Sequence, residues 1–211
     1  MTTFGFIVKT CAVCKKKRRL VHLTSSNQMG SPDLDLRPSE MYRSTMGLWV
    51  ERCPFCGYAA RDISQETTIE RSFLDTPEYL NCNNYPIVSD LAKMFYQAYL
   101  ICRHDGKELK ETYTLLLNAA WASDDEDDKA MAVEFRKAAV KELNQMKLLT
   151  QEQQILKADL MRRAGMFDEV ISEYSDFAGD EKLLKDIVDF EIQKCLEKDD
   201  GCYKVSDVVD D

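Results

Sequence analysis

The sequence predicts an α+β protein in which a small β-rich unit precedes a larger, mainly α-helical domain. The chain changes in charge near residue 75: residues 1–75 contain 11 Lys and Arg against 8 Asp and Glu, whereas residues 76–211 contain 17 against 29. The first part holds β-prone stretches and paired cysteines, while apolar residues in the second part recur at helical spacing. With 45% hydrophobic residues, the chain has enough apolar side chains to form folded cores.

Residues 1–62 are expected to form the β-rich unit around two C-x-x-C pairs. FGFIV at 4–8 precedes Cys11 and Cys14, and LWVER at 48–52 precedes Cys53 and Cys56. Each C-x-x-C closes a tight turn that directs two thiolates toward one point, so two turns supply the four ligands of a tetrahedral Zn²⁺. The pattern therefore predicts a structural Zn²⁺ in a zinc-ribbon-like unit, with unmetallated buried cysteines or a redox pair as alternatives.

The two cysteine turns, which we call knuckles, differ in their residues. In CPFCGY, Pro54 stiffens the turn and Gly57 permits a backbone conformation in which N–H groups reach a thiolate. CAVCKK lacks both residues and is the weaker half of the predicted site. The 38-residue spacer between the pairs exceeds the roughly 15–20 residues of the common pattern. SSNQMGSPD at 25–33 is therefore expected to loop out.

Five consecutive cations, from Lys15 to Arg19, follow the first knuckle directly. Four thiolates around one Zn²⁺ leave a net charge of −2, so we expect the cations to balance the site. A phosphate-binding patch is the alternative. The net charge of −9 and the lack of aromatic residues interleaved with the cations argue against nucleic acid as a partner.

The spacing of apolar residues divides the rest of the chain into a linker, a helical domain and a tail. Residues 63–86 are expected to be a linker, because TTIERSFLDTPEYLNCNNYP has no sustained period and ends in turn-forming residues. Residues 87–200 are expected to form the helical domain, and residues 201–211 an acidic tail. Helices are predicted from apolar spacing and capping residues within 91–102, 109–121, 131–146, 150–164, 167–177 and 183–196.

Part of this region resembles tetratricopeptide repeats. In KADLMRRAGMFDEVISEY, Ala158, Gly165, Phe167, Val170 and Tyr174 fall where the small and aromatic positions of that repeat lie. The usual Trp and Pro of the repeat are missing, and the predicted hairpin at 88–122 fits the 34-residue period poorly. We therefore expect repeat-like helical pairs, with a plain α-helical bundle as the alternative.

Stacked helical pairs present a concave face, on which aromatic and cationic side chains contact partners. Tyr96 and Arg103 on the first predicted helix, and Arg162 and Arg163 on the fourth, are the expected contact residues. The last two are adjacent cations within the acidic half of the chain.

CPFCGY at 53–58 and AAWASDD at 119–125, together with KADLMRRAGMFDEVI, resemble an uncharacterised bacterial family known only as a domain of unknown function. Members of that family join a start with two C-x-x-C pairs, similar to a zinc ribbon, to a tetratricopeptide-like helical remainder. The resemblance covers nearly the whole chain. It implies this architecture and no activity.

The sequence favours a non-enzymatic interaction protein with a structural Zn²⁺ and an unidentified protein partner. It contains no phosphate-cradling glycine loop, G-x-S-x-G elbow or H-E-x-x-H motif, and its two histidines, His22 and His104, are expected to be ordinary surface or loop residues. The alternatives are a nucleic-acid-binding zinc ribbon and a zinc–thiolate redox sensor. No apolar run reaches the roughly 18 residues of a membrane helix and no signal-peptide core is evident, so we expect a cytoplasmic protein with reduced thiols.

Overall fold

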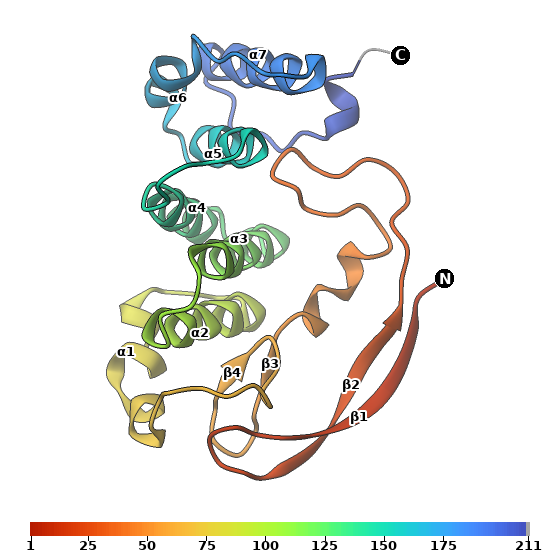
Figure 1. Cartoon of the computed structure of the whole chain (residues 1–211), viewed down its shortest axis with the longest axis vertical. Coiled ribbons are helices and arrows are strands. Elements are labelled where there is room, and N and C mark those ends of the chain that lie inside the picture. The colour runs from red at the N-terminus through yellow and green to blue at the C-terminus, as the bar shows by residue number, and fades with distance from the viewer. Residues whose placement is uncertain (210–211) are drawn as a thin grey trace.

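The computed structural model describes residues 1–209 and confirms the α+β class. Helices follow one another along the longest axis of the molecule, and two short β-hairpins lie beside one end of this stack (Figure 1). The loop that joins the hairpins runs along the stack toward its other end. The N-terminal unit is thus in contact with much of the helical region.

Two antiparallel pairs make up the β unit. β1 (Thr3–Thr10) pairs with β2 (Lys17–Ser25), and β3 (Glu51–Arg52) pairs with β4 (Ala59–Ala60). The strand predicted at 4–8 lies in β1. The one predicted at 48–52 is reduced to β3, because Arg43–Leu48 forms a 3₁₀ helix, η1. β2 was not predicted, since its consecutive cations hide the alternation that marks a strand.

Within residues 1–209, the helical region consists of one short helix and six longer ones. The helices are α1 (Pro77–Leu80), α2 (Asp90–His104), α3 (Leu109–Asp125), α4 (Lys129–Leu143), α5 (Gln151–Arg163), α6 (Phe167–Tyr174) and α7 (Lys182–Leu196). The six predicted helices correspond to α2–α7. Each packs on the next along the chain from α2 to α7, and α5 also packs on α7.

Side chains at the helix ends explain several of these bounds. Ser89 accepts a hydrogen bond from the Ala92 amide at the start of α2. Thr150 and Gln153 form the predicted capping box of α5. Gly165 follows α5 with a φ of +75°, a left-handed conformation that favours glycine and ends the helix. None of the described helices is both long and apolar enough to cross a lipid bilayer.

The segments expected to be linker and tail both contact the rest of the protein. Within 63–86 lie α1 and two 3₁₀ helices, η2 (Arg71–Asp75) and η3 (Cys82–Asn84), and the side chains of Leu74 and Tyr79 are buried. In the acidic 201–211 segment, the Val205 amide donates to the Pro32 carbonyl at 2.9 Å, and Val205–Asp207 forms the 3₁₀ helix η4. Residues 210 and 211 of the expected tail lie outside the described residues.

Candidate metal centre

The four predicted ligands lie together. The Sγ atoms of Cys11, Cys14, Cys53 and Cys56 are all within 4.8 Å of one another. Two pairs join the knuckles: Cys11 to Cys56 and Cys14 to Cys53, each at 3.6 Å. A tetrahedral ion with metal–sulfur bonds of about 2.3 Å requires sulfur–sulfur separations of about 3.8 Å. The four thiols therefore fit a single tetrahedral metal ion.

Both knuckles have the same local conformation despite their different sequences. In each, the residue after the second cysteine has a positive φ, +59° for Lys15 and +79° for Gly57. Its amide donates to the carbonyl of the first cysteine, at 3.0 Å from Lys15 to Cys11 and at 2.8 Å from Gly57 to Cys53. The first knuckle thus forms the metal-binding turn with a lysine where the second has glycine.

The thiols differ in their surroundings. Cys11, Cys53 and Cys56 are buried, whereas Cys14 is partly accessible. Burial raises the pKa of the Cys11 and Cys56 thiols. At Cys14, burial is outweighed by the Lys16 amide and the neighbouring thiols, which lower its pKa. A bound cation would favour the thiolate form of all four.

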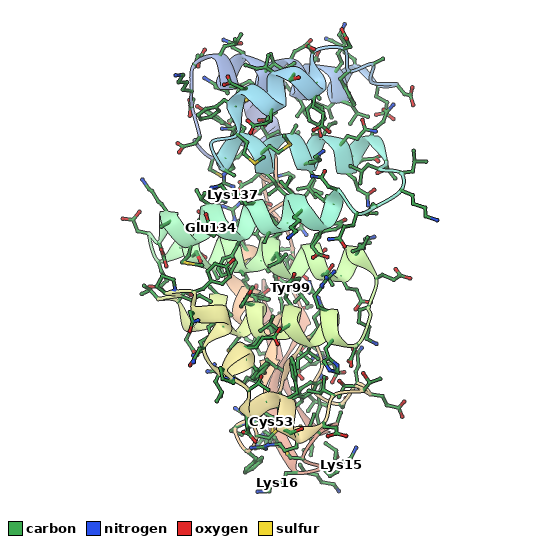
Figure 2. All side chains as sticks on the ribbon, turned by 90° about the vertical axis from the view of Figure 1, so that its left-hand side faces the viewer. Lys15, Lys16, Cys53, Tyr99, Glu134 and Lys137 are labelled. Atoms are coloured by element: carbon green, nitrogen blue, oxygen red, sulfur yellow. The ribbon has the colours of Figure 1, made fainter. Side chains whose placement is uncertain are left out.

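The cation run lies at the same end of the molecule as Cys53 (Figure 2). Lys15 Nζ donates to the Ala12 carbonyl at 2.6 Å, and an Arg18 guanidinium nitrogen donates to the Arg52 carbonyl at 3.0 Å. Lys16 Nζ lies 4.9 Å from the centre of the Phe55 ring. Three cations of the run therefore contact residues in or next to the knuckles, and their described hydrogen bonds are to backbone oxygens.

Two side chains connect the metal centre with its surroundings. The buried Tyr79 hydroxyl in α1 donates to the Gly57 carbonyl at 2.7 Å and accepts from the Ala59 amide at 3.0 Å. Lys9 in β1 forms ion pairs with Glu51 at 2.8 Å and Asp62 at 3.1 Å, which connect the two hairpins. We did not single out these residues from the sequence, which gives no signal that a tyrosine in an expected linker contacts a cysteine knuckle.

The expected contact residues on α2 lie in different environments. Tyr96 is only 4% exposed and packs against the rings of Tyr85, Tyr99 and Phe135, with centroids 5.4–5.5 Å away. It therefore belongs to an aromatic core rather than to an accessible face. Arg103 is half-exposed, and its guanidinium pairs with the buried Glu142 at 3.3 Å.

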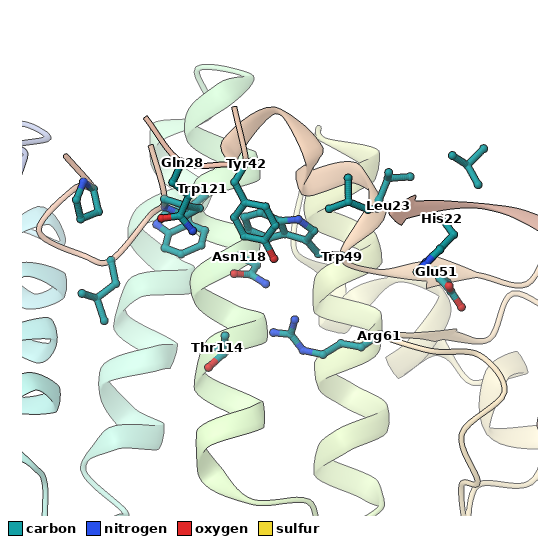
Figure 3. A pocket seen from close by; sticks show the side chains of 15 residues that line it. His22, Leu23, Gln28, Tyr42, Trp49, Glu51, Arg61, Thr114, Asn118 and Trp121 are labelled. Carbon is teal, nitrogen blue, oxygen red and sulfur yellow. The ribbon is translucent and has the colours of Figure 1, made fainter. Parts of the chain in front are cut away.

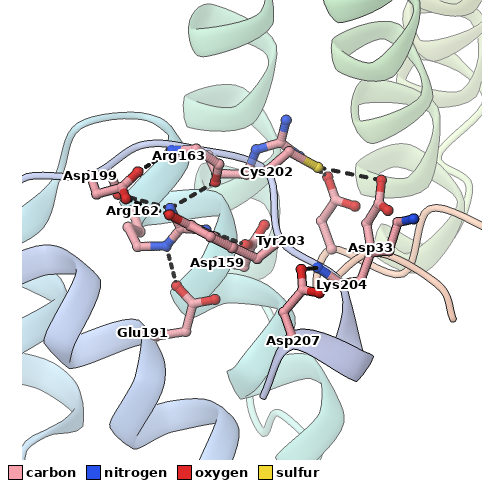
Figure 4. Close-up of polar contacts among 12 residues, drawn as sticks. Asp33, Asp159, Arg162, Arg163, Glu191, Asp199, Cys202, Tyr203, Lys204 and Asp207 are labelled. Atoms are coloured by element: carbon pink, nitrogen blue, oxygen red, sulfur yellow. Dashed lines mark hydrogen bonds and ion pairs between the residues drawn. The ribbon is translucent and has the colours of Figure 1, made fainter. Parts of the chain in front are cut away.

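The expectation that Arg162 and Arg163 are exposed requires correction, because both are buried. Arg162 is fully buried; its Nε donates to Glu191 at 2.5 Å and an Nη donates to Asp159 at 2.9 Å (Figure 4). Arg163 is 9% exposed and pairs with Asp35 and with Asp124. Carboxyl groups from α5, α7 and the N-terminal loop hold the two guanidiniums within the core, so neither is accessible to a partner.

Comparisons of the chain with protein-family models, with curated proteins and with solved structures found no match. The family resemblance carried by CPFCGY and AAWASDD therefore stays a prediction. The structure is the only support for the four-cysteine cluster and for the helical region that follows it.

Proposed function

We propose that this chain is a non-enzymatic interaction protein whose N-terminal zinc-ribbon-like unit is held together by a structural Zn²⁺. The observation that carries the proposal is the closure of four cysteine sulfurs around one point, with separations that fit one tetrahedral ion. Four protein ligands fill the coordination sphere of Zn²⁺ and leave no position for a substrate, as is typical of structural sites. A reducing compartment such as the cytoplasm would keep these thiols available to the metal.

An exposed apolar face on the first hairpin supports the interaction role. Phe4, Phe6 and Val8 alternate along β1 and are 58%, 66% and 63% exposed, and Val21, which pairs with Phe6, is 47% exposed. We call these four residues the hairpin face. A patch of large apolar side chains on a soluble protein is typical of a contact surface. The hairpin face replaces the buried arginines as the expected contact with a protein partner.

The buried positions of α5 and α6 support a tetratricopeptide-like arrangement of the helical pairs. Ala158, Val170 and Tyr174 are at most 3% exposed and lie between the packed helices, as the repeat pattern requires. Such a stack would serve as the rigid body from which the hairpin extends.

Elemental analysis of the purified, reduced protein tests the zinc assignment. We expect one Zn²⁺ per chain, lost in Cys53→Ser and Cys56→Ser but retained in Cys102→Ser, which removes a partly buried thiol outside the cluster. Metal well below one per chain, with the N-terminal fold intact, would contradict the proposal. Reversible release of zinc by a mild oxidant would instead favour the redox-sensor alternative.

The interaction role has its own test. The double change Phe4→Ser and Phe6→Ser should leave the thermal unfolding midpoint nearly unchanged, because both side chains are exposed. It should reduce the recovery of a protein that co-purifies with the parent chain. Unchanged recovery would exclude the hairpin face as the contact surface.

One observation favours nucleic acid as a second candidate partner. Arg19 lies 3.9 Å from the centre of the exposed Phe6 ring, and Lys16 lies over Phe55, so two cations of the run each contact a ring that is distant from them in the sequence. Gel shifts with single-stranded RNA and DNA at several salt concentrations decide between the candidates. Nucleic acid would be favoured if the parent binds it and the double variant Lys16→Gln, Arg19→Gln shows a weaker dependence of affinity on salt. The slope of log affinity against log salt concentration should then fall in magnitude by about 2.

A further inference from the structure

A cleft of about 680 Å³ lies between β2, the η1 segment and α3 (Figure 3). This volume is within the roughly 300–1,000 Å³ typical of ligand sites. We call it the tryptophan cleft, because both tryptophans of the chain line it. The residues used in the argument are Val21, Tyr42, Trp49, Arg61, Asn118 and Trp121.

One wall of the cleft consists of aromatic rings that contact one another. Tyr42 stacks on Trp49 with ring centroids 4.8 Å apart, and Trp49 meets Trp121 edge to face at 6.5 Å. Trp49 Nε1 donates to Thr45 Oγ1 at 2.9 Å, and Trp121 Nε1 donates to Asp35 at 2.8 Å. Because both indole N–H groups have acceptors within the protein, the two tryptophans offer an entering molecule apolar contact without an unpaired N–H group.

Arg61, directly after β4, extends into the same cleft toward Asn118 and Thr114 (Figure 3). No carboxylate of residues 1–209 is within ion-pair distance of its guanidinium. Glu51, which also lines the cleft, forms an ion pair with Lys9 and accepts a hydrogen bond from the Ile63 amide. With its amide oxygen facing Arg61, Asn118 accepts from the guanidinium at 3.3 Å and donates to the Thr114 carbonyl at 3.2 Å. The cleft thus holds one oriented guanidinium that no described carboxylate pairs with at ion-pair distance.

β2 also borders the cleft. Three consecutive residues of this strand, 21–23, line it. Because side chains of a strand alternate between faces, three successive lining residues indicate contact along the strand edge. Among the described strands β2 pairs only with β1, so its other edge has unpaired N–H and C=O groups. Such an edge accepts an added strand from another chain.

We propose that the tryptophan cleft binds an extended peptide segment of a partner protein, with a carboxylate next to an aromatic or branched apolar side chain. The backbone of this segment pairs with β2, its apolar side chain packs against Trp49 and Tyr42, and its carboxylate pairs with Arg61. A guanidinium matches the two oxygens of a carboxylate in a bidentate pair. A phosphate group, with a charge of about −1.5 to −2, would need a second cation. The proposal rests on the interaction role and names the class of partner.

Tryptophan fluorescence reports on this site directly, since both tryptophans line it. The probe is a capped pentapeptide of alternating Phe and Val with a central Asp, compared with the same peptide carrying Asn. We expect saturable fluorescence changes with both peptides and about tenfold tighter binding of the Asp peptide. In Arg61→Gln this preference should disappear, while the affinity for the Asn peptide stays unchanged. The matched control Arg71→Gln, which removes an exposed arginine in η2, should keep the preference.

Equal affinity of the parent for both peptides, or an equal loss of both in Arg61→Gln, would overturn the proposal. So would the absence of any fluorescence change up to millimolar peptide. Tighter binding of a phosphoserine peptide than of the Asp peptide would assign the site to phosphate and overturn the carboxylate class. These outcomes are independent of zinc content, so a failure here is distinguishable from a failure of the structural zinc proposal.

Discussion

Arg163 in α5 and Asp35 in the N-terminal loop, 128 residues apart in the chain, form a buried ion pair of 2.5 Å. Asp35 also accepts from Trp121 in α3 and lies 3.9 Å from Arg136 in α4. One carboxylate therefore connects the loop that follows β2 to three helices. Its position indicates that the N-terminal unit and the helical stack depend on each other for stability.

Loss of this pair should destabilise the whole protein. We expect Arg163→Met to lower the free energy of unfolding by about 3–5 kcal/mol, because it leaves the carboxylate of Asp35 buried with less compensation. Urea unfolding monitored by tryptophan fluorescence measures this. The matched control is Lys137→Met in α4, whose exposed pair with Glu134 should contribute at most about 0.5 kcal/mol (Figure 2). Equal effects of the two changes would contradict the coupling.

Because both knuckles have a left-handed residue after the second cysteine, adding glycine to one and removing it from the other should have opposite effects on stability. Lys15→Gly should stabilise the first knuckle by about 1 kcal/mol. A left-handed conformation costs an L-residue about 1–2 kcal/mol, and glycine avoids this cost. Part of the gain is offset because glycine has more conformational entropy to lose when the chain folds. Gly57→Ala should destabilise the second by about 1–2 kcal/mol. No atom lies within 4 Å of the added Cβ, so this cost is from the backbone alone.

Competition with a zinc chelator measures both changes. We expect slower zinc loss from Lys15→Gly and faster loss from Gly57→Ala than from the parent. Similar loss from all three proteins would show that the turn conformation does not limit metal retention. The exposed Gly47, with a φ outside the left-handed region and no atom near an added Cβ, provides the neutral control Gly47→Ala.

Tyr79 offers a test of how the metal centre is attached to the helices. Tyr79→Phe removes the donor to the Gly57 carbonyl and the acceptor of the Ala59 amide while keeping the buried ring. We expect a loss of about 1–3 kcal/mol in unfolding free energy, because both backbone groups lose their partner in a buried region. Tyr113→Phe, at another buried tyrosine, in α3, is the control. A near-zero effect in Tyr79→Phe would show that water replaces the hydroxyl.

Local patterns made the cysteine cluster and the main helices predictable. Each C-x-x-C spacing dictates a turn, and the apolar period dictates the buried face of a helix, so both are encoded within a few residues. The capping box at Thr150 was predictable for the same reason.

Long-range pairing explains what the sequence did not reveal. Arg162 and Arg163 are predicted as contact residues from the sequence because they are adjacent cations in the acidic half of the chain. Their partners Glu191 and Asp35 are 29 and 128 residues away, and only the tertiary fold brings them together. The cleft was missed for the same reason, since Trp49, Arg61 and Trp121 belong to separate segments.

The carboxyl groups around Arg162 predict an unusual pH dependence of stability. Burial and the neighbouring Asp159 raise the pKa of Glu191 to about 8, well above its ordinary value of 4.5. Burial also raises the pKa of Asp159. Asp159 and Glu191 each keep one buried oxygen without a hydrogen-bond partner among the described residues, so two carboxylates compete for one guanidinium.

Because the folded pKa of Glu191 is above the unfolded value, the folded protein holds a proton that the unfolded chain releases. The associated stability is fully present below about pH 4.5 and is lost as the pH rises through about 8. We therefore expect the free energy of unfolding to fall between pH 6 and 8.5 with zinc held saturating. The range begins at pH 6 because acid protonates the thiolate ligands and releases the metal.

Glu191→Gln tests this assignment, because glutamine imitates the protonated carboxyl and still accepts from Arg162. Urea unfolding should show a smaller decline from pH 6 to 8.5 than in the parent, with greater stability than the parent at pH 8.5. Glu134→Gln, on the exposed face of α4, should keep the decline of the parent. A parent protein whose stability is constant or rises over this range, or a Glu191→Gln variant with the same slope, would show that Glu191 is ionised in the folded state.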